Sequence, residues 1–222
     1  MRAPGTARLL KWVLRRASSP EHLGFAARIL PRLGGAIPRT ETGAEFVRLS
    51  CTAEDWAARY LAARSIAHMT PDLIATAEVW GRLLGLARDQ VAAVREGVPF
   101  GIAEVVQRCP IAATRLECLL VDTAAPSQER KAALRSLVIL AVAPGTAELA
   151  ERLLPAAARA GGSVAAGVGP VIVGRGIGRR DPERAFKILT DWLASDDPVL
   201  REQASRAMRR PLVETSSAEG AQ

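Results

Sequence analysis

Arginines at a nearly constant spacing are the residues of this chain best suited to bind charged groups. Arg59, Arg95, Arg130 and Arg201, together with Ala165, mark five positions separated by 36, 35, 35 and 36 residues. A guanidinium group forms a planar, bidentate fork that fits a phosphate or a carboxylate. Equal positions of a repeating structure align along one surface, so these four arginines could form a stripe that binds phosphates or a partner.

A second group of basic side chains lies near the start of the chain, at Arg8, Lys11, Arg15 and Arg16. Residues 1–40 hold eight basic side chains and one acidic side chain, a net charge of +7 that equals the charge of the whole chain. Such a segment could contact nucleic-acid phosphates, an anionic membrane or an acidic protein. The alternatives are the solvated outer face of a capping hairpin and an arginine-rich transit peptide.

The familiar arrangements of catalytic and metal-binding residues are missing from the sequence. There is no HExxH motif, no GxSxG motif and no Ser-His-Asp set in a recognisable context. The chain has two histidines, and none of its three cysteines (Cys51, Cys109 and Cys118) forms a CxxC pair, which argues against a zinc site. We expect three small, buried cysteines in a cytoplasmic protein, no metal, no cofactor and no enzymatic activity.

A glycine-rich segment is a further candidate for phosphate binding, with glycines at Gly167, Gly169, Gly174, Gly176 and Gly178. A glycine loop that cradles a phosphate in the Rossmann or P-loop manner follows a strand, and no strand is evident before this segment. We therefore interpret it as a helix in which glycines permit close packing and which Pro170 strains.

The elements that position the arginines are predicted to be helices. Small or apolar residues stand three positions after each mark, at Ala62, Val98, Ala133, Val168 and Ala204. Larger apolar residues stand seven positions after each mark, at Ile66, Ile102, Leu137, Ile172 and Met208. A period near 35 with helical spacing inside it is typical of stacked helical hairpins, in which each hairpin buries its apolar face against the next. The larger position should face the core, and the small position should let neighbouring helices approach.

Each repeat should contain a first helix, a turn and a second helix that begins near the mark. We expect the first helices around 46–47, 79–86, 111–120, 147–154 and 184–193, and the second helices over 53–68, 90–108, 126–142, 163–178 and 198–210. Capping residues precede prolines at Thr70-Pro71, Asp181-Pro182 and Asp197-Pro198, a pattern typical of helix starts. The predicted organisation is a basic capping hairpin over 1–40, a repeat array over 41–212 and a disordered tail over 213–222.

Two stretches, residues 88–97 and 192–204, each contain a helix end, a turn with an aspartate and an aliphatic-arginine pair that opens the next helix. In this they resemble the HEAT and armadillo superfamily. The resemblance implies a right-handed superhelix with a concave face that binds a partner. It also implies a structural role for the repeated arginine, which in such units pairs with a turn aspartate, here Asp89 or Asp196.

The last repeat, from Asp181 to Glu202, is also similar to the repeats of HEAT-like DNA alkylation repair proteins. That resemblance implies a site built from tryptophans, an arginine and an aspartate one helical turn after a tryptophan. Trp192 has Asp196 at this spacing, but Trp80 is followed by Leu84 and Trp56 by Tyr60. The sequence therefore matches the scaffold of these proteins more closely than it matches their site.

We therefore expect an all-α protein: a right-handed, HEAT-like solenoid of about six helical hairpins. A compact helical bundle would share the same periodicity. The expected function is a non-enzymatic interaction scaffold that binds a protein partner on its concave face. The alternatives are a DNA-binding relative of the alkylpurine glycosylases and an adaptor that binds membrane surfaces through its N-terminal helix.

Overall fold

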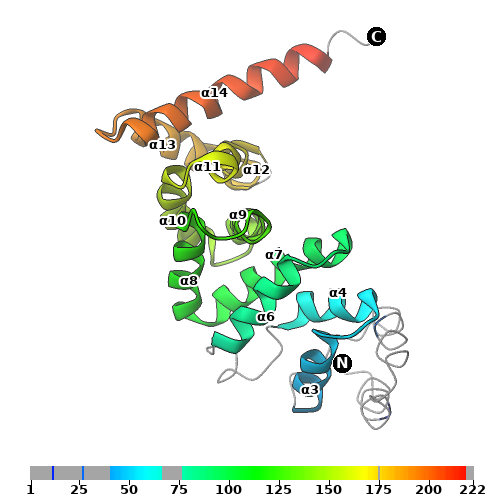
Figure 1. Ribbon diagram of the computed structural model, residues 1–222. Helices are drawn as coiled ribbons and strands as arrows, with labels where there is room; N and C mark the ends of the chain where they lie inside the picture. The colour runs from blue at the N-terminus through cyan, green and yellow to red at the C-terminus, as the bar shows by residue number, and fades with distance from the viewer. Residues whose placement is uncertain (1–11, 13–26, 28–40, 67–76, 175, 219–222) are drawn as a thin grey trace. The chain divides into compact units, whose positions relative to one another are not determined.

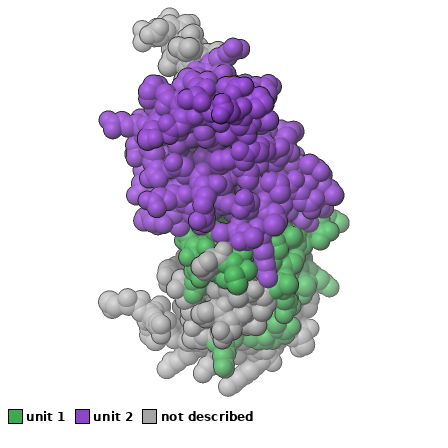
Figure 2. Space-filling view, turned by 90° about the vertical axis from the view of Figure 1, so that its left-hand side faces the viewer, with its two compact units in different colours: residues 1–112 green, residues 113–222 purple. Residues whose placement is uncertain are grey.

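The structure is a computed structural model that describes Trp12, Ala27 and residues 41–66, 77–174 and 176–218. Within these ranges the secondary structure is helical and contains no strand, which confirms the all-α class. The chain divides into two compact units, residues 1–112 and residues 113–222 (Figure 2).

The described residues of the first unit form two successive helical hairpins (Figure 1). The helices of these hairpins are α3 (Glu41–Ser50), α4 (Trp56–Ser65), α6 (Ala77–Ala87) and α7 (Ala92–Arg108). α4 packs along α7, α3 packs on α4, and α6 packs on α7. The second helices of the two hairpins are therefore direct neighbours, as the predicted stacking requires.

The second unit continues the alternation of helix and turn (Figure 1). α8 (Pro110–Val121) begins at the end of the first unit, and α9 (Ser127–Val142), α10 (Ala147–Arg159) and α11 (Gly162–Gly169) follow it. A short π-helix, η3 (Pro170–Gly174), then leads to α12 (Ile177–Arg180), α13 (Pro182–Leu193) and α14 (Pro198–Ala218). α10 contacts α9, α11 and α14, so adjacent hairpins of this unit also share an interface.

The core follows the repeat that the sequence predicts. Ala62, Val98, Ala133, Val168 and Ala204, three positions after the marks, are all fully buried. Seven positions after the marks, Ile66, Ile102, Leu137 and Ile172 are also buried, whereas Met208 in the last helix is half-buried. Full burial of one such aliphatic side chain contributes about 1.5–3 kcal/mol, so these positions stabilise every hairpin in turn.

The close contact between α4 and α7 depends on glycine. A Cβ atom built on Gly101 of α7 would lie 2.1 Å from the main-chain oxygen of Ala63 in α4. A main-chain oxygen cannot move away as a flexible side chain can, so a larger residue at Gly101 would separate the two helices.

The second helix of the fourth repeat, the repeat marked by Ala165, differs from the continuous helix expected over 163–178. α11 ends at Gly169, and the π-helix η3 begins at Pro170. Proline has no N–H to donate and glycine is a poor helix former, so the regular pattern of hydrogen bonds fails here. The packing explanation of the glycines is supported at Gly176, where a Cβ atom would lie 1.9 Å from the main-chain oxygen of Val171.

Two further boundaries can be compared with the predictions. α4 begins at Trp56, three residues later than expected, because Asp55 forms its N-cap. α14 extends to Ala218 rather than ending near 210, so residues 213–218, which we expected to be disordered, continue the helix. The N-terminal hairpin over 1–40 and the predicted start at Thr70-Pro71 lie outside the described residues, apart from Trp12 and Ala27.

No helix of the described residues combines the length and the apolar character needed to cross a bilayer.

Candidate functional site

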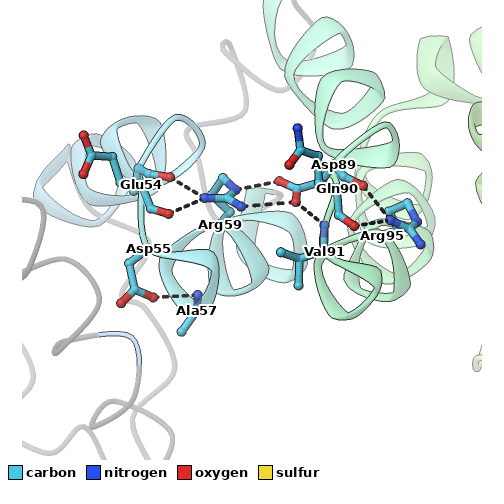
Figure 3. A network of polar contacts seen from close by, with 9 residues as sticks. Glu54, Asp55, Ala57, Arg59, Asp89, Gln90, Val91 and Arg95 are labelled. Carbon is cyan, nitrogen blue, oxygen red and sulfur yellow. Dashed lines mark hydrogen bonds and ion pairs between the residues drawn. The ribbon is translucent and has the colours of Figure 1, made fainter.

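Arg59 joins two successive turns of the first unit (Figure 3). Its Nη1 atom donates to the main-chain oxygens of Ala53, at 2.7 Å, and Glu54, at 2.6 Å, in the turn before its own helix. Its Nε and Nη2 atoms donate to Asp89 in the next turn, at 2.6 Å from Oδ2 and 3.2 Å from Oδ1. One guanidinium thus satisfies carbonyl groups of its own repeat and a carboxylate of the following repeat.

Local sequence explains how Arg59 reaches this position. Asp55 caps α4 by accepting a hydrogen bond from the N–H of Ala57 at 2.8 Å, which fixes the start of the helix. The N–H of Arg59 bonds back to the carbonyl oxygen of Asp55, so Arg59 lies one helical turn further on. Asp55 is thus used to start the helix, and the backbone of Glu54 is used as an acceptor for Arg59.

Asp89 is the most enclosed charged group of this network, because only 8% of its side chain is exposed. Besides the two bonds from Arg59, its Oδ1 atom accepts the N–H of Val91 at 2.8 Å. Burial alone raises the pKa of Asp89, but the Arg59 hydrogen bond, the Val91 N–H and the charges of Arg59 and Arg95 together lower it below its ordinary value. The Asp89 hydrogen bond in turn raises the pKa of Arg59, so the pair is fully charged at neutral pH.

The contact between the repeated arginine and its own turn recurs along the chain. Arg95 donates from Nη1 to the main-chain oxygens of Asp89, at 2.7 Å, and Gln90, at 2.8 Å (Figure 3). Arg201 donates from Nη1 to the main-chain oxygen of Ser195 at 2.6 Å. In each case the acceptor lies six residues before the arginine, as Ala53 lies before Arg59.

The contact with the following turn also recurs, at an offset of 30 residues. Arg130 donates from Nη2 to the main-chain oxygen of Ala160 at 2.8 Å, just as Arg59 reaches Asp89. Ala160 offers a carbonyl group where Asp89 offers a carboxylate. As a result, the buried Nε atom of Arg130 has no hydrogen-bond partner among the described residues.

The repeat that carries Ala165 in place of arginine is linked forward by a different residue. Arg159, at the end of α10, bonds from Nε to the Oδ2 atom of Asp197 at 2.8 Å. Asp197 also accepts the N–H of Val199 at 2.8 Å, and the Arg159 hydrogen bond lowers the pKa of Asp197. The aspartate that forms the ion pair in this turn is therefore Asp197. The resemblance had indicated its neighbour Asp196.

These contacts favour the structural interpretation of the repeated arginines over a phosphate-binding stripe. The guanidinium groups of Arg59 and Arg95 are directed to turn carbonyls, and Arg59 also holds a carboxylate. Arg201 differs, because it is exposed and forms one such bond within the described residues. The N-terminal candidates Arg8, Lys11, Arg15 and Arg16 lie outside the described residues.

A groove of about 370 Å³ lies between α10 and α13. Its lining includes three acidic side chains, two arginines and Trp192. Glu151 pairs with Arg184 at 2.6 Å, and Asp191 pairs with Lys187 at 2.7 Å. Much of the charge around this groove is therefore already balanced within the chain.

The described residues contain no group of three or more His, Cys, Asp or Glu side chains arranged to hold a metal ion. The three cysteines are free thiols. Cys51 and Cys109 are buried as expected, and burial raises the pKa of Cys51 to about 11. Cys118 is exposed, so the expectation of three buried cysteines is wrong at this position.

No family model, curated protein or solved structure matches this chain.

Proposed function

We propose that this protein is a non-enzymatic interaction scaffold: a right-handed, HEAT-like solenoid of about six hairpins that binds a protein partner on its concave face. The observation that carries the proposal is a pair of recurring contacts of the repeated arginines. Arg59, Arg95 and Arg201 bond their own turn six residues back, and Arg59 and Arg130 bond the next turn 30 residues ahead. A constant offset between successive hairpins is what a solenoid requires, because each hairpin contacts only its neighbours.

The proposal also accounts for how the charged side chains are used. Arg59, Asp89, Arg159 and Asp197 join one hairpin to the next, and Glu151 and Arg184 join α10 to α13. Links of this kind fix neighbouring hairpins in place and leave the exposed helix surfaces available to a partner. The three free thiols suit a reducing compartment, so we propose the cytoplasm as the location.

Chemical cross-linking in intact cells, followed by mass spectrometry, tests the scaffold proposal. A protein cross-linked to the chain is then purified, and its binding to the purified chain is measured. The proposal expects a complex of fixed stoichiometry whose formation requires no substrate turnover. If no cross-linked protein binds the purified chain, the proposal is refuted.

The charge of residues 1–40 supports one alternative, a DNA-binding protein related to the alkylpurine glycosylases. A segment with eight basic side chains and one acidic side chain attracts phosphates and releases their counterions on binding. Duplex binding should then weaken steeply as salt rises, and the quadruple change of Arg8, Lys11, Arg15 and Arg16 to alanine should abolish it. An absence of duplex binding at low salt would exclude this alternative.

A further inference from the structure

A cluster of aromatic side chains and one arginine lies on the exposed side of α4 and α7. The guanidinium carbon of Arg64 stands 4.4 Å from the centre of the Phe100 ring, which is a cation–π contact. The Nη1 atom of Arg64 also donates to the hydroxyl oxygen of Tyr60 at 3.2 Å. These two contacts hold the guanidinium against the surface of the protein.

Trp56 extends this cluster along α4. Trp56, Tyr60 and Arg64 are spaced four residues apart, so they lie on one face of the helix. Trp56 is 45% exposed and Phe100 is 42% exposed, although aromatic residues make up 4% of the chain. Three of the nine aromatic side chains therefore gather at one place, where they leave apolar surface in contact with water.

A glycine lets the side chains of this surface pack closely against α7. A Cβ atom built on Gly97 of α7 would lie 3.1 Å from a ring carbon of Tyr60 and 3.3 Å from the Cγ atom of Arg64. Tyr60 and Arg64 therefore rest directly on the backbone of α7. A surface whose side chains are already ordered loses less conformational entropy when a partner binds.

Arg64 differs from other arginines of this unit in its charge balance. Arg48, Arg59 and Arg82 each pair with a carboxylate, at 2.6 to 2.7 Å. Among the residues that the structure describes, no carboxylate forms an ion pair with Arg64, and its Nε and Nη2 atoms have no hydrogen-bond acceptor. An acceptor for these two donors therefore has to come from a partner, and a carboxylate is the acceptor that fits a guanidinium best.

We infer that the surface formed by Trp56, Tyr60, Arg64 and Phe100 binds an acidic segment of the protein partner. A carboxylate of that segment pairs with the two open donors of Arg64, and a neighbouring apolar side chain packs against Trp56. A nucleic acid fits this surface less well, because the guanidinium already covers one face of the Phe100 ring and so removes one place on which a base could stack. The inference rests on the proposed scaffold function and specifies where the partner binds.

A library of random twelve-residue peptides displayed on phage, selected on the full-length protein, tests the assignment. The selected peptides should carry Asp or Glu beside an aromatic or aliphatic residue. The Kd of a synthetic peptide, measured by fluorescence anisotropy, should rise about tenfold in Arg64→Gln, as expected when a charge-assisted hydrogen-bonded pair is lost. Trp56→Ala should weaken binding similarly, and Arg64→Lys should give an intermediate Kd because lysine keeps the charge without the planar fork.

Arg206→Gln serves as the matched control, since Arg206 is an exposed helical arginine of the second unit that pairs with Glu202 on its own helix. This variant should bind the peptide with the wild-type Kd, and circular dichroism should show that all variants keep their helical content. Peptides that bind the wild type and the Arg64 and Trp56 variants equally would overturn the assignment but leave the scaffold proposal intact. Selection of no peptide, or binding of oligo(dT) that depends on Arg64, would also overturn it, whereas the scaffold proposal depends on the separate cross-linking experiment.

Discussion

Replacement of Asp89 by asparagine tests the link between the two described hairpins of the first unit. Asparagine keeps the shape of the side chain and an oxygen that can accept the N–H of Val91, so the turn keeps its cap. The substitution removes the negative charge that Arg59 holds with two hydrogen bonds. Arg59→Gln removes the other partner, and the double variant completes a thermodynamic cycle.

The size of the effect follows from the burial of the pair. Exposed ion pairs contribute about 0.2–1 kcal/mol, whereas hydrogen bonds to charged groups contribute about 1.5–3 kcal/mol. The exposed fractions of the Arg59 and Asp89 side chains are 18% and 8%, which places the pair nearer the second case. We expect a coupling energy of about 2 kcal/mol and a Tm of Asp89→Asn lower by about 4–8 °C.

The effect of Asp89→Asn should also depend on pH with a definite sign. The pKa of Asp89 in the folded protein is lowered from its ordinary value of 3.8, so the stabilisation is complete above that value. It is lost as the pH falls through the lowered pKa of the folded state. The difference in unfolding free energy between wild type and Asp89→Asn should therefore be constant from neutral pH down to about pH 5 and shrink only below 3.8.

Urea unfolding followed by circular dichroism gives the four free energies of the cycle at neutral pH. A coupling energy below about 0.5 kcal/mol would refute the view that this pair joins the hairpins, because it would place the pair among weak surface contacts. A coupling energy that falls between pH 8 and pH 6 would contradict the assigned protonation of Asp89.

Three further predictions use matched variants of the same chain. Gly101→Ala should lower the free energy of unfolding by about 1–3 kcal/mol, because its Cβ atom meets a main-chain oxygen at 2.1 Å. Gly85→Ala, in an open part of α6, should instead raise this free energy by about 0.5–1 kcal/mol. Urea unfolding measures both changes. Equal effects of the two substitutions would contradict the packing explanation. Cys118 should react with a thiol reagent at pH 8 far faster than Cys51, whose pKa of about 11 leaves little thiolate. Mass spectrometry of the labelled peptides measures the two rates. The reverse order would refute the burial of Cys51. Arg159→Gln should cost less than about 1 kcal/mol in urea unfolding because 54% of the Arg159 side chain is exposed, and a loss as large as that of Asp89→Asn would be inconsistent with this exposure.

The helix pattern and the core could be predicted because they depend on short-range spacing. The marks at intervals near 35 residues located the hairpins, and the positions three and seven residues after them proved to be buried, with Met208 of the last helix half-buried as the exception. The turn aspartates at Asp55, Asp181 and Asp197 each accept an N–H at or next to a helix start, as local capping chemistry requires.

The forward links were harder to predict, because they depend on where two distant turns meet. The sequence indicated that arginines and turn aspartates should pair, but nothing in a linear pattern distinguished Asp197 from its neighbour Asp196. Arg159 was missed because it belongs to the end of the preceding first helix rather than to the arginine series. The absence of an arginine at Ala165 was the signal that another residue had to supply this link.

The exposure of Cys118 and the break in the second helix of the fourth repeat could have been recognised from the sequence. On α8 the buried positions include Leu116, Leu119 and Leu120, and Cys118 is out of phase with them. Pro170 follows Gly169 directly, so the chain there lacks both a donor and a good helix former. The exact path after Pro170, a π-helix, depends on packing that the sequence pattern does not show.

The measurement that tests the central claim most directly is the Kd of a purified cross-linked partner for the purified chain at physiological salt. The scaffold proposal predicts saturable binding at fixed stoichiometry with a Kd of about 10 μM or lower. Failure of every cross-linked protein to bind, together with tight duplex DNA binding that weakens steeply with salt, would contradict the proposal and favour the nucleic-acid alternative.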